Sequence, residues 1–354
     1  MTLIDRYIGR SLIHATLLAL LVLLAVDVLF VFINEVQDIG KGSYSLLNVF
    51  AYIALSLPGS AIDVFAMAAL LGTLLGLGTL AGHSELTGMR AAGVSILRIV
   101  RSALQAGALM LVVVAVAGEW ITPYTDQLAQ EKRNFAQSDQ VSFKSRHGFW
   151  ARDGNRFINL RQILPDGRFA GISVYTLDDR LRLTTLLEAE AAQLSGDEWI
   201  LDDVSRSEFL DDQYTMETSP RMVVTSVMNP ELINLVLTSA DNLSVRDLYR
   251  YIRYLKANNL DASPYQLAFW RRLGMPLSTL VMVLLAIPFV FGPLRSARTG
   301  QRLLVGVLVG IGYFLAERTL SHVGQVYGFD PAISALAAPL MVFAVSLFFF
   351  RSLR

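Results

Sequence analysis

Long uninterrupted apolar runs constrain this sequence more than any other feature. A bilayer core about 30 Å thick is crossed by roughly 20 apolar residues in an α-helix. Six runs of this kind stand out, at about 12–33, within 46–81, and at 103–121, 273–291, 303–320 and 332–350. Only 17% of the residues are charged, against about 25% in an ordinary soluble domain. The sequence therefore predicts an α-helical membrane protein with six transmembrane helices.

Two of these runs need interpretation. The run at 46–81 is too long for one upright span, and it contains Pro58 and Gly59, where we expect a kink or a change from interfacial to spanning helix. We place the second span after them. The run at 12–33 is longer than the apolar core of a signal peptide and lacks a small-residue cleavage site, so we expect it to remain as an anchor.

Basic residues in the short loops indicate the orientation. Positively charged residues favour the cytoplasmic side, and long translocated segments count little in this rule. With both termini inside, Lys41 lies in a short outer loop. The inner side then holds Arg6, Arg10, Arg90, Arg98, Arg101, Arg295, Arg298, Arg302, Arg351 and Arg354. We therefore expect both termini to be cytoplasmic and the long segment between the third and fourth spans to be outside.

That long segment has the character of a soluble all-β domain. Turn signals such as Asp153-Gly154, Asp166-Gly167 and Gly196-Asp197 separate runs with two-residue alternation, as at Ile158 and Leu160 or at Leu181 and Leu183. This spacing predicts a sandwich or jelly roll, flanked by helices at 125–137 and 244–258. Ser244, with Asp247 three residues on, is the expected cap of the second helix. The expected division is 1–122 (membrane helices), 123–264 (β domain) and 265–354 (membrane helices).

Motifs for catalysis are missing. The sequence has no GxxxxGK[ST] phosphate loop, no HExxH and no GxSxG, and its four histidines are far apart. It has no cysteine for a thiolate metal site or a thiol nucleophile. Its 30 basic and 30 acidic residues balance without a basic tract for nucleic acid. We expect a non-hydrolysing subunit with no cofactor, no metal and no nucleic-acid partner.

Several residues in the apolar runs invite two interpretations. Ionisable side chains are costly inside a bilayer, so they mark either functional groups such as a proton relay or positions near solvated headgroups. They are Asp27, Asp63, Glu119, Glu317 and Arg318. GxxxG spacings also allow close helix contact but arise by chance in glycine-rich spans. They occur at Gly72 with Gly76 and at Gly306 with Gly310.

The inner loop HSELTGMRAAGV, at 83–94, predicts a short helix. Ser84 is a natural N-cap, and Glu85 lies at the positive end of the helix dipole. From these residues alone the loop is either a solvated connection or a docking element.

Five separated segments of the chain resemble the YjgP/YjgQ-type permeases of lipopolysaccharide export. They read IDRYIG at 4–9, SELTGMRAAG at 84–93, GEWITP at 118–123, GFWARDGNRFI at 148–158 and FGPLRS at 291–296. The likeness spans nearly the whole chain. It implies a permease of an ATP-binding-cassette exporter in the Gram-negative inner membrane, which extracts lipopolysaccharide and passes it to a periplasmic bridge. It also implies a periplasmic jellyroll-like domain between the third and fourth membrane helices.

The resemblance also implies partners and contact residues. The partners are a sister permease, LptF, an ATPase dimer, LptB, the single-span periplasmic LptC, the bridge protein LptA, and lipopolysaccharide itself. The loop near 83–93 becomes the coupling helix, docking on the ATPase through Ser84, Glu85, Leu86, Met89, Arg90 and Gly93. Lipopolysaccharide has phosphates and acyl chains, so basic and aromatic residues are its expected contacts. Our candidates are Lys41, Lys132, Arg133, Arg271, Arg272, Arg318, Phe30, Phe32, Tyr313 and Phe314.

Other functions remain open at this point. One alternative is a permease of another lipid or lipoprotein-releasing exporter. Another is a non-transporting membrane anchor whose outer β domain binds a partner. A third is an intramembrane enzyme that uses carboxylates such as Asp27 and Asp63.

Overall fold

The computed structural model describes residues 3–137, 143–163, 168–178, 180–195, 198–210, 213–225, 240–291 and 299–352. Six helices in these ranges are long and apolar enough to cross a membrane. They are α1 (Leu3–Val36), α2 (Leu46–Gly82), the continuous segment Ile96–Gln137, α8 (Ser263–Phe291), α9 (Thr299–Tyr327) and α10 (Pro331–Ser352). The prediction of six spans is confirmed. Arg295, Arg298, Arg354 and the turn signals at 166–167 and 196–197 lie outside the described residues.

The third membrane segment combines three elements. It consists of α4 (Ile96–Val116), one turn of π-helix, η1 (Ala117–Ile121), and α5 (Thr122–Gln137). The helix expected at 125–137 is therefore an extension of the membrane span. Helix α2 continues through Pro58 and Gly59 without a break. A proline inside a membrane helix leaves one backbone carbonyl without its usual N–H donor, and groups in neighbouring helices can satisfy that carbonyl.

The segment between the third and fourth spans contains an antiparallel sheet of six strands. Each strand pairs with its neighbours in chain order. The strands are β1 (Phe143–Asp153), β2 (Arg156–Ile163), β3 (Phe169–Leu177), β4 (Leu183–Ser195), β5 (Glu198–Leu210) and β6 (Gln213–Thr225). The all-β character of the insert is confirmed, and the described strands form one up-and-down sheet. Leu181 was expected in a strand, but it lies exposed in the turn before β4 with a positive φ of 59°.

One face of the sheet is apolar, although the alternation changes phase along the strands. Ile158 and Leu160 are buried as the alternation predicts. Further along, buried residues follow one another at a spacing of three, in the pairs Phe169 and Ile172, Ala189 and Ala192, and Leu201 and Val204. Gly171 lies between the two buried residues of the pair in β3, and Asp203 lies between those of the pair in β5. Both have positive φ values, 71° and 51°. One additional residue thus separates the buried positions in each of these strands. Because the additional residues lie opposite one another, the pairing register is the same before and after them, and the buried side chains stay on one face.

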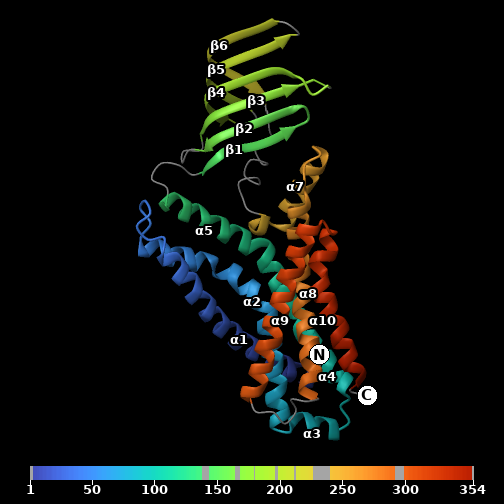
Figure 1. Ribbon diagram of the computed structural model, residues 1–354. Helices are drawn as coiled ribbons and strands as arrows, with labels where there is room; N and C mark the ends of the chain where they lie inside the picture. The colour runs from blue at the N-terminus through green and yellow to red at the C-terminus, as the bar shows by residue number, and fades with distance from the viewer. Residues whose placement is uncertain are drawn as a thin grey trace.

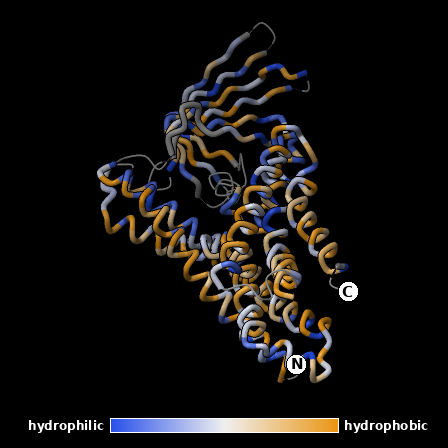
Figure 2. The backbone as a smooth tube through the Cα atoms, turned by 60° about the horizontal axis from the view of Figure 1, so that its bottom comes forward, coloured by the Kyte–Doolittle hydropathy of each residue, from blue (hydrophilic) through white to orange (hydrophobic). Residues whose placement is uncertain are grey.

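The sheet lies at one end of the helical part and α3 (Glu85–Ala91) at the other, with both chain termini toward the α3 end (Figure 1). We call these the sheet end and the α3 end. Between helices and sheet lie α5 and α7 (Val245–Ala257). The short helix η2 (Ala240–Asn242) precedes α7. Figure 2 shows hydrophobic residues along the long helices and hydrophilic residues mixed with them in the sheet.

Glycines allow α2 to pack closely against α1 and α9. A Cβ atom on Gly72 would lie 2.2 Å from Thr16 Oγ1 and 2.4 Å from Thr16 Cα. A Cβ on Gly306 would lie 2.6 Å from Leu71 Cδ2, and one on Gly310 would lie 2.7 Å from Met67 Cγ. Both GxxxG spacings therefore mark close helix contacts, in agreement with the packing interpretation.

Candidate functional site

Helices α1 and α9 turn apolar surface away from the rest of the chain. In the most apolar 18-residue segment of each, only 11% of the residues are buried. Large side chains stay exposed on both: Leu17, Leu18, Leu21, Leu29 and Phe30 on α1, and Leu304, Leu308, Ile311, Phe314 and Leu315 on α9. In a membrane such surfaces contact lipid or another apolar helix.

The four aromatic residues expected to contact acyl chains divide into two pairs. Phe30 is 62% exposed and Phe314 is 45% exposed, so both face outward. Phe32 instead packs against Phe50, with ring centroids 5.9 Å apart. Tyr313 shares a hydrogen bond of 2.6 Å with Ser278 Oγ and packs against the helical core.

Two of the basic candidates belong to an ion-pair network at the sheet end of α1. Arg133 Nε lies 2.9 Å from Glu35 Oε2, and Arg133 Nη2 donates to Asp38 Oδ2 at 2.8 Å. Lys41 Nζ donates to Asp38 Oδ1 at 2.5 Å. Buried Tyr44 donates to Glu35 Oε2 at 2.8 Å. The network joins the end of α1 to α5, and Arg133 is occupied by it.

The network also shifts two pKa values in the loop after α1. Hydrogen bonds from Lys41 and then Arg133 hold the pKa of Asp38 below its ordinary value. Burial, followed by the hydrogen bond to the Glu35 carboxylate, raises the pKa of Tyr44. The Asp38 carboxyl is therefore held ionised, and the Tyr44 phenol is held neutral.

Arg271 and Arg272 also have partners within the chain, two acidic side chains for the first and a carbonyl oxygen for the second. Arg271 Nη1 lies 3.6 Å from Asp241 Oδ1, and its Nε lies 3.7 Å from Glu317 Oε1. Arg272 Nη1 donates to the Asp241 carbonyl oxygen at 3.5 Å. These contacts tie α8 to η2 and α9. They also account for Glu317, whose carboxylate faces the Arg271 guanidinium.

Lys132 and Arg318 remain as exposed basic side chains, and neither forms an ion pair within the described ranges. The Arg318 guanidinium carbon lies 5.7 Å from the centroid of the Phe314 ring. This cation–π pair sits on the outward surface of α9, at the half of the helix nearer the sheet end. It presents a positive charge beside an apolar ring.

Helix α3 is held to the membrane helices by one face. Leu86 is buried in the helical core, Met89 packs against it, and Glu85 Oε2 accepts a hydrogen bond of 2.8 Å from Tyr7 Oη. Arg90 and Gly93 are exposed. Ser84 occupies the N-cap position, but the expectation that its side chain caps the helix is wrong. Its φ is 61° and its side chain makes no capping hydrogen bond.

Glu119 makes a contact that the sequence did not reveal. It lies in the π-helical turn η1, and its Oε2 accepts a hydrogen bond of 2.9 Å from the backbone N–H of Val245, at the start of α7. Its Oε1 accepts a second one of 3.4 Å from Arg246 N. An acidic residue in an apolar run was the available signal, but its partner is 126 positions away in the chain.

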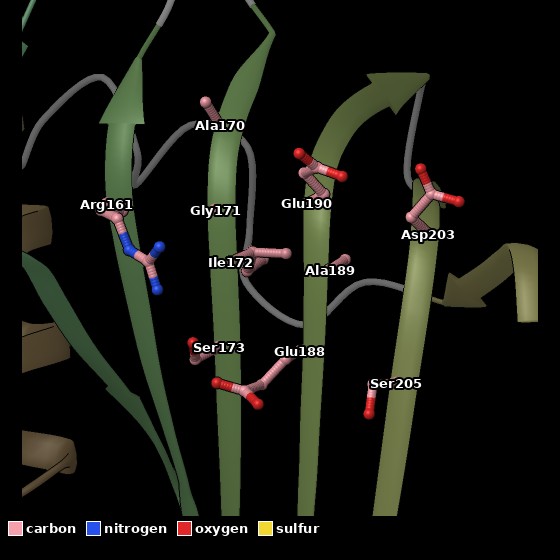
Figure 3. Close-up of a pocket in the computed structure, with 10 residues that line it drawn as sticks. All are labelled: Arg161, Ala170, Gly171, Ile172, Ser173, Glu188, Ala189, Glu190, Asp203 and Ser205. Carbon is pink, nitrogen blue, oxygen red and sulfur yellow. The ribbon is translucent and has the colours of Figure 1, made fainter. Parts of the chain in front are cut away.

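A hollow of about 450 Å³ opens on the sheet, lined from β2 to β5 (Figure 3). Its carboxylates, Glu188, Glu190 and Asp203, outnumber its one guanidinium, Arg161. A surplus of negative charge disfavours a phosphate-bearing ligand, so we do not place a lipid headgroup there. Across the described ranges, acidic and histidine side chains form no group of three or more that could hold a metal ion.

Comparisons with known proteins agree with this architecture. A family model described as lipopolysaccharide export system permease LptF/LptG matches residues 6–352. The lipopolysaccharide export system permease protein LptG of Escherichia coli (strain K12) is 32% identical over 355 residues, covering 97% of this chain and 96% of the relative. The LptG protein of Haemophilus influenzae is 33% identical over 351 residues, covering 99% and 98%. This chain belongs to the LptF/LptG family of lipopolysaccharide export system permeases.

Proposed function

We propose that this chain is the permease subunit of an ATP-binding-cassette exporter that takes lipopolysaccharide out of the inner membrane and passes it to a periplasmic bridge. The outward apolar faces of α1 and α9 carry the proposal. A lipid with several acyl chains needs membrane helices whose apolar side chains are open to it. Among the six spans in the described ranges, the two least buried supply such surfaces.

For the lipid headgroup, the contacts within the chain favour Arg318 over most other candidates. A phosphate prefers an arginine that is not already paired. Arg133, Arg271 and Arg272 have acidic or carbonyl acceptors close by, and Lys41 has Asp38. Arg318, together with Phe314, offers a cation and an apolar ring on one outward surface. Lys132, exposed on α5, is the second candidate.

Helix α3 is the proposed docking element for an ATPase dimer of the LptB type. Leu86 and Met89 hold the helix to the membrane bundle, which leaves Arg90 and the exposed residues around it for a partner. Because α3 is packed on the ends of the membrane helices, a push on it is transmitted to them. ATP would then be hydrolysed by the partner and not by this chain.

The remaining assembly follows from the same proposal. The arginine asymmetry and the common end shared by α3 and the termini favour a cytoplasmic α3 end and a periplasmic sheet. A sister permease of the LptF type would complete the cavity. LptC and LptA would receive lipid at the sheet. We keep the division into 1–122, 123–264 and 265–354 as the proposed functional parts.

Purification tests the proposal. The tagged chain, isolated from membranes in mild detergent, is expected to bring with it a soluble ATPase, a second six-span permease and bound lipopolysaccharide. ATP hydrolysis by the complex is then measured with and without added lipopolysaccharide. A chain isolated without ATPase and without lipid would contradict the proposal.

Two substitutions separate docking from folding of α3. Arg90→Glu changes an exposed charge and is expected to reduce ATPase co-purification while the permease stays folded. Leu86→Ala removes a buried side chain and is expected to lower the melting temperature of the permease, because a cavity of this kind costs about 2 to 5 kcal/mol. Full ATPase retention in Arg90→Glu would argue against docking at this face.

A further inference from the structure

The sheet is joined to the membrane helices by two connections. The chain enters the sheet through α5, which continues the third membrane segment, and it leaves toward α7, which precedes α8. We propose that Glu119 is a positioning residue that fastens the membrane ends of these two connections together. It thereby fixes the sheet relative to the membrane helices. The consequence for lipid transfer rests on the proposed function, whereas the positional claim does not.

At the membrane end of α7, Glu119 binds the helix from outside. Its carboxylate accepts hydrogen bonds from Val245 N and Arg246 N, two of the first backbone donors of α7. The positive end of a helix dipole favours a carboxylate at this place. The helix has its own cap as well, since Ser244 Oγ accepts from Asp247 N at 3.1 Å. Glu119 therefore adds a link between segments to a helix that is already capped.

The π-helical turn η1 places Glu119 within a membrane segment. Single π-helical turns are rare in proteins, and those that occur are often found at functional sites. One extra residue in a turn rotates the following helix face by about 100°, the angle that separates successive residues of an α-helix. Glu119 lies in this turn, between α4 and α5 of the third membrane segment.

At the other end, α7 binds the sheet. Tyr254 Oη donates to the carbonyl oxygen of Arg152 at 2.6 Å. Gly154 N donates to Asn258 Oδ1 at 3.0 Å, in the turn between β1 and β2. Both contacts hold the β1–β2 turn at the C-terminal end of α7.

Helix α7 is packed against its neighbours along its length, so a shift at its N-terminal end is expected to move its C-terminal end as well. Leu248, Tyr251 and Leu255 are buried, and the rings of Tyr251 and Tyr265 of α8 meet edge to face with centroids 4.6 Å apart. At 1.5 Å per residue, 13 residues span about 20 Å. The path therefore runs from η1 through Glu119 along α7 to the β1–β2 turn, and it consists of direct contacts.

Two variants remove the link from its two sides. Glu119→Ala deletes the acceptor, and Val245→Pro deletes the closer of its two donors, the Val245 N–H, and leaves the longer contact from Arg246 N. Val245 is the first residue of α7, where proline is favoured. Ser244 has φ −65° and ψ 161°, the extended conformation that a following proline requires. Glu131→Ala, which removes an exposed acidic side chain from α5, is the matched control.

The readout is a distance between spin labels. The sequence has no cysteine, so Asn155→Cys in the β1–β2 turn and Phe329→Cys between α9 and α10 can be labelled as a pair in the full chain in lipid nanodiscs. A single narrow distance is expected in the parent and in the Glu131→Ala control. Glu119→Ala and Val245→Pro should each broaden it, and combining them should broaden it no further. Glu119→Gln keeps an acceptor oxygen and should restore most of the narrow distance.

The outcomes separate the inference from the proposed function. An unchanged distance in Glu119→Ala would overturn the positional claim, whatever the chain transports. Additive broadening in the double variant would overturn it too, because the two residues would then act independently. In the assembled complex, Glu119→Ala should lose lipopolysaccharide transfer while it retains ATP hydrolysis. Undiminished transfer would overturn the part of the claim that concerns transport.

Discussion

Helix α2 and its neighbours α1 and α9 are all apolar, yet they are packed very differently. In the most apolar 18-residue segment, 67% of the residues of α2 are buried, against 11% in both α1 and α9. Helix α2 lies against α1, α8 and α9, with glycines at its close approaches to α1 and α9. Helices α1 and α9 each use one narrow strip for this contact and leave the rest of their apolar surface outside.

The difference shows that hydropathy and burial are separate properties of a membrane helix. In a bilayer, an apolar side chain is as stable against a lipid tail as against another helix. Helix packing is therefore decided by shape complementarity and by small residues. A glycine that faces a backbone therefore says more about burial than a run of leucines. The surfaces left open on α1 and α9 are available for another molecule, and the proposed transport function uses them.

The largest effect is expected at Gly72. In Gly72→Ala the new Cβ would lie 2.4 Å from Thr16 Cα, a backbone atom that cannot move without shifting α1. We expect a loss of about 3 kcal/mol in the free energy of unfolding, as for severe overpacking. The measurement is thermal unfolding in detergent. Gly312→Ala is the control, because nothing lies within 4 Å of its added Cβ, and alanine favours a helix over glycine by up to about 1 kcal/mol. Equal effects of the two substitutions would contradict this packing.

Arg133 should have the next largest effect. The ion-pair network fixes the end of α1, which is otherwise little buried. Arg133→Ala leaves the buried Glu35 carboxylate without its cation. Because Arg133 is itself partly exposed, we expect a loss of about 2 kcal/mol, below the range for a fully buried pair. Lys41→Ala removes an exposed partner of Asp38 and should cost less than about 0.5 kcal/mol. Chemical denaturation of both variants compares them, and the reverse order would refute this ranking.

Gly310→Ala should have a smaller effect than Gly72→Ala. Its new Cβ would meet Met67 Cγ at 2.7 Å, and a methionine side chain can move aside. We expect a loss of about 1 kcal/mol in unfolding free energy. If this variant proved as unstable as Gly72→Ala, the contact between α2 and α9 would have to be as rigid as that between α2 and α1.

The smallest effect concerns pH. The pKa of Asp38 is lowered in the folded protein from an ordinary value of 3.8. The carboxylate therefore stabilises the fold at pH values above about 4, and this contribution is lost as the pH falls through the lowered pKa. The melting temperature should fall more steeply between pH 5 and pH 3 in the parent than in Asp38→Asn. Parallel curves would show that Asp38 contributes nothing to stability.

The sequence predicted the elements of this fold better than their contacts. The six membrane helices, the all-β insert and the Ser244 cap follow from local patterns, namely apolar length, alternation and a capping residue. The GxxxG contacts were left open, since glycine spacing alone does not name a partner. Pairing is a long-range property, so nothing local showed that Arg133 faces Glu35 or that Glu119 reaches α7.

Two local expectations failed for local physical reasons. Ser84 has the right residue type for a cap, but its left-handed backbone prevents a capping hydrogen bond. Leu181 was expected to alternate with Leu183 in a strand, but its positive φ of 59° places it in the turn before β4, where it is exposed. Neither failure affects the basic candidates, whose roles depend on which of them already have acidic partners.

Site-specific photo-cross-linking tests the transport account most directly. A benzoylphenylalanine is placed at Phe30 on α1, at Phe314 on α9 or at Phe348 on α10, three exposed aromatic positions, in cells that express the whole exporter. The account predicts lipopolysaccharide adducts from the probes on α1 and α9 and few from the probe on α10, although all three face apolar surroundings. Equal adducts from all three positions, or none from α1 and α9, would contradict the claim that these two helices form the transport surface.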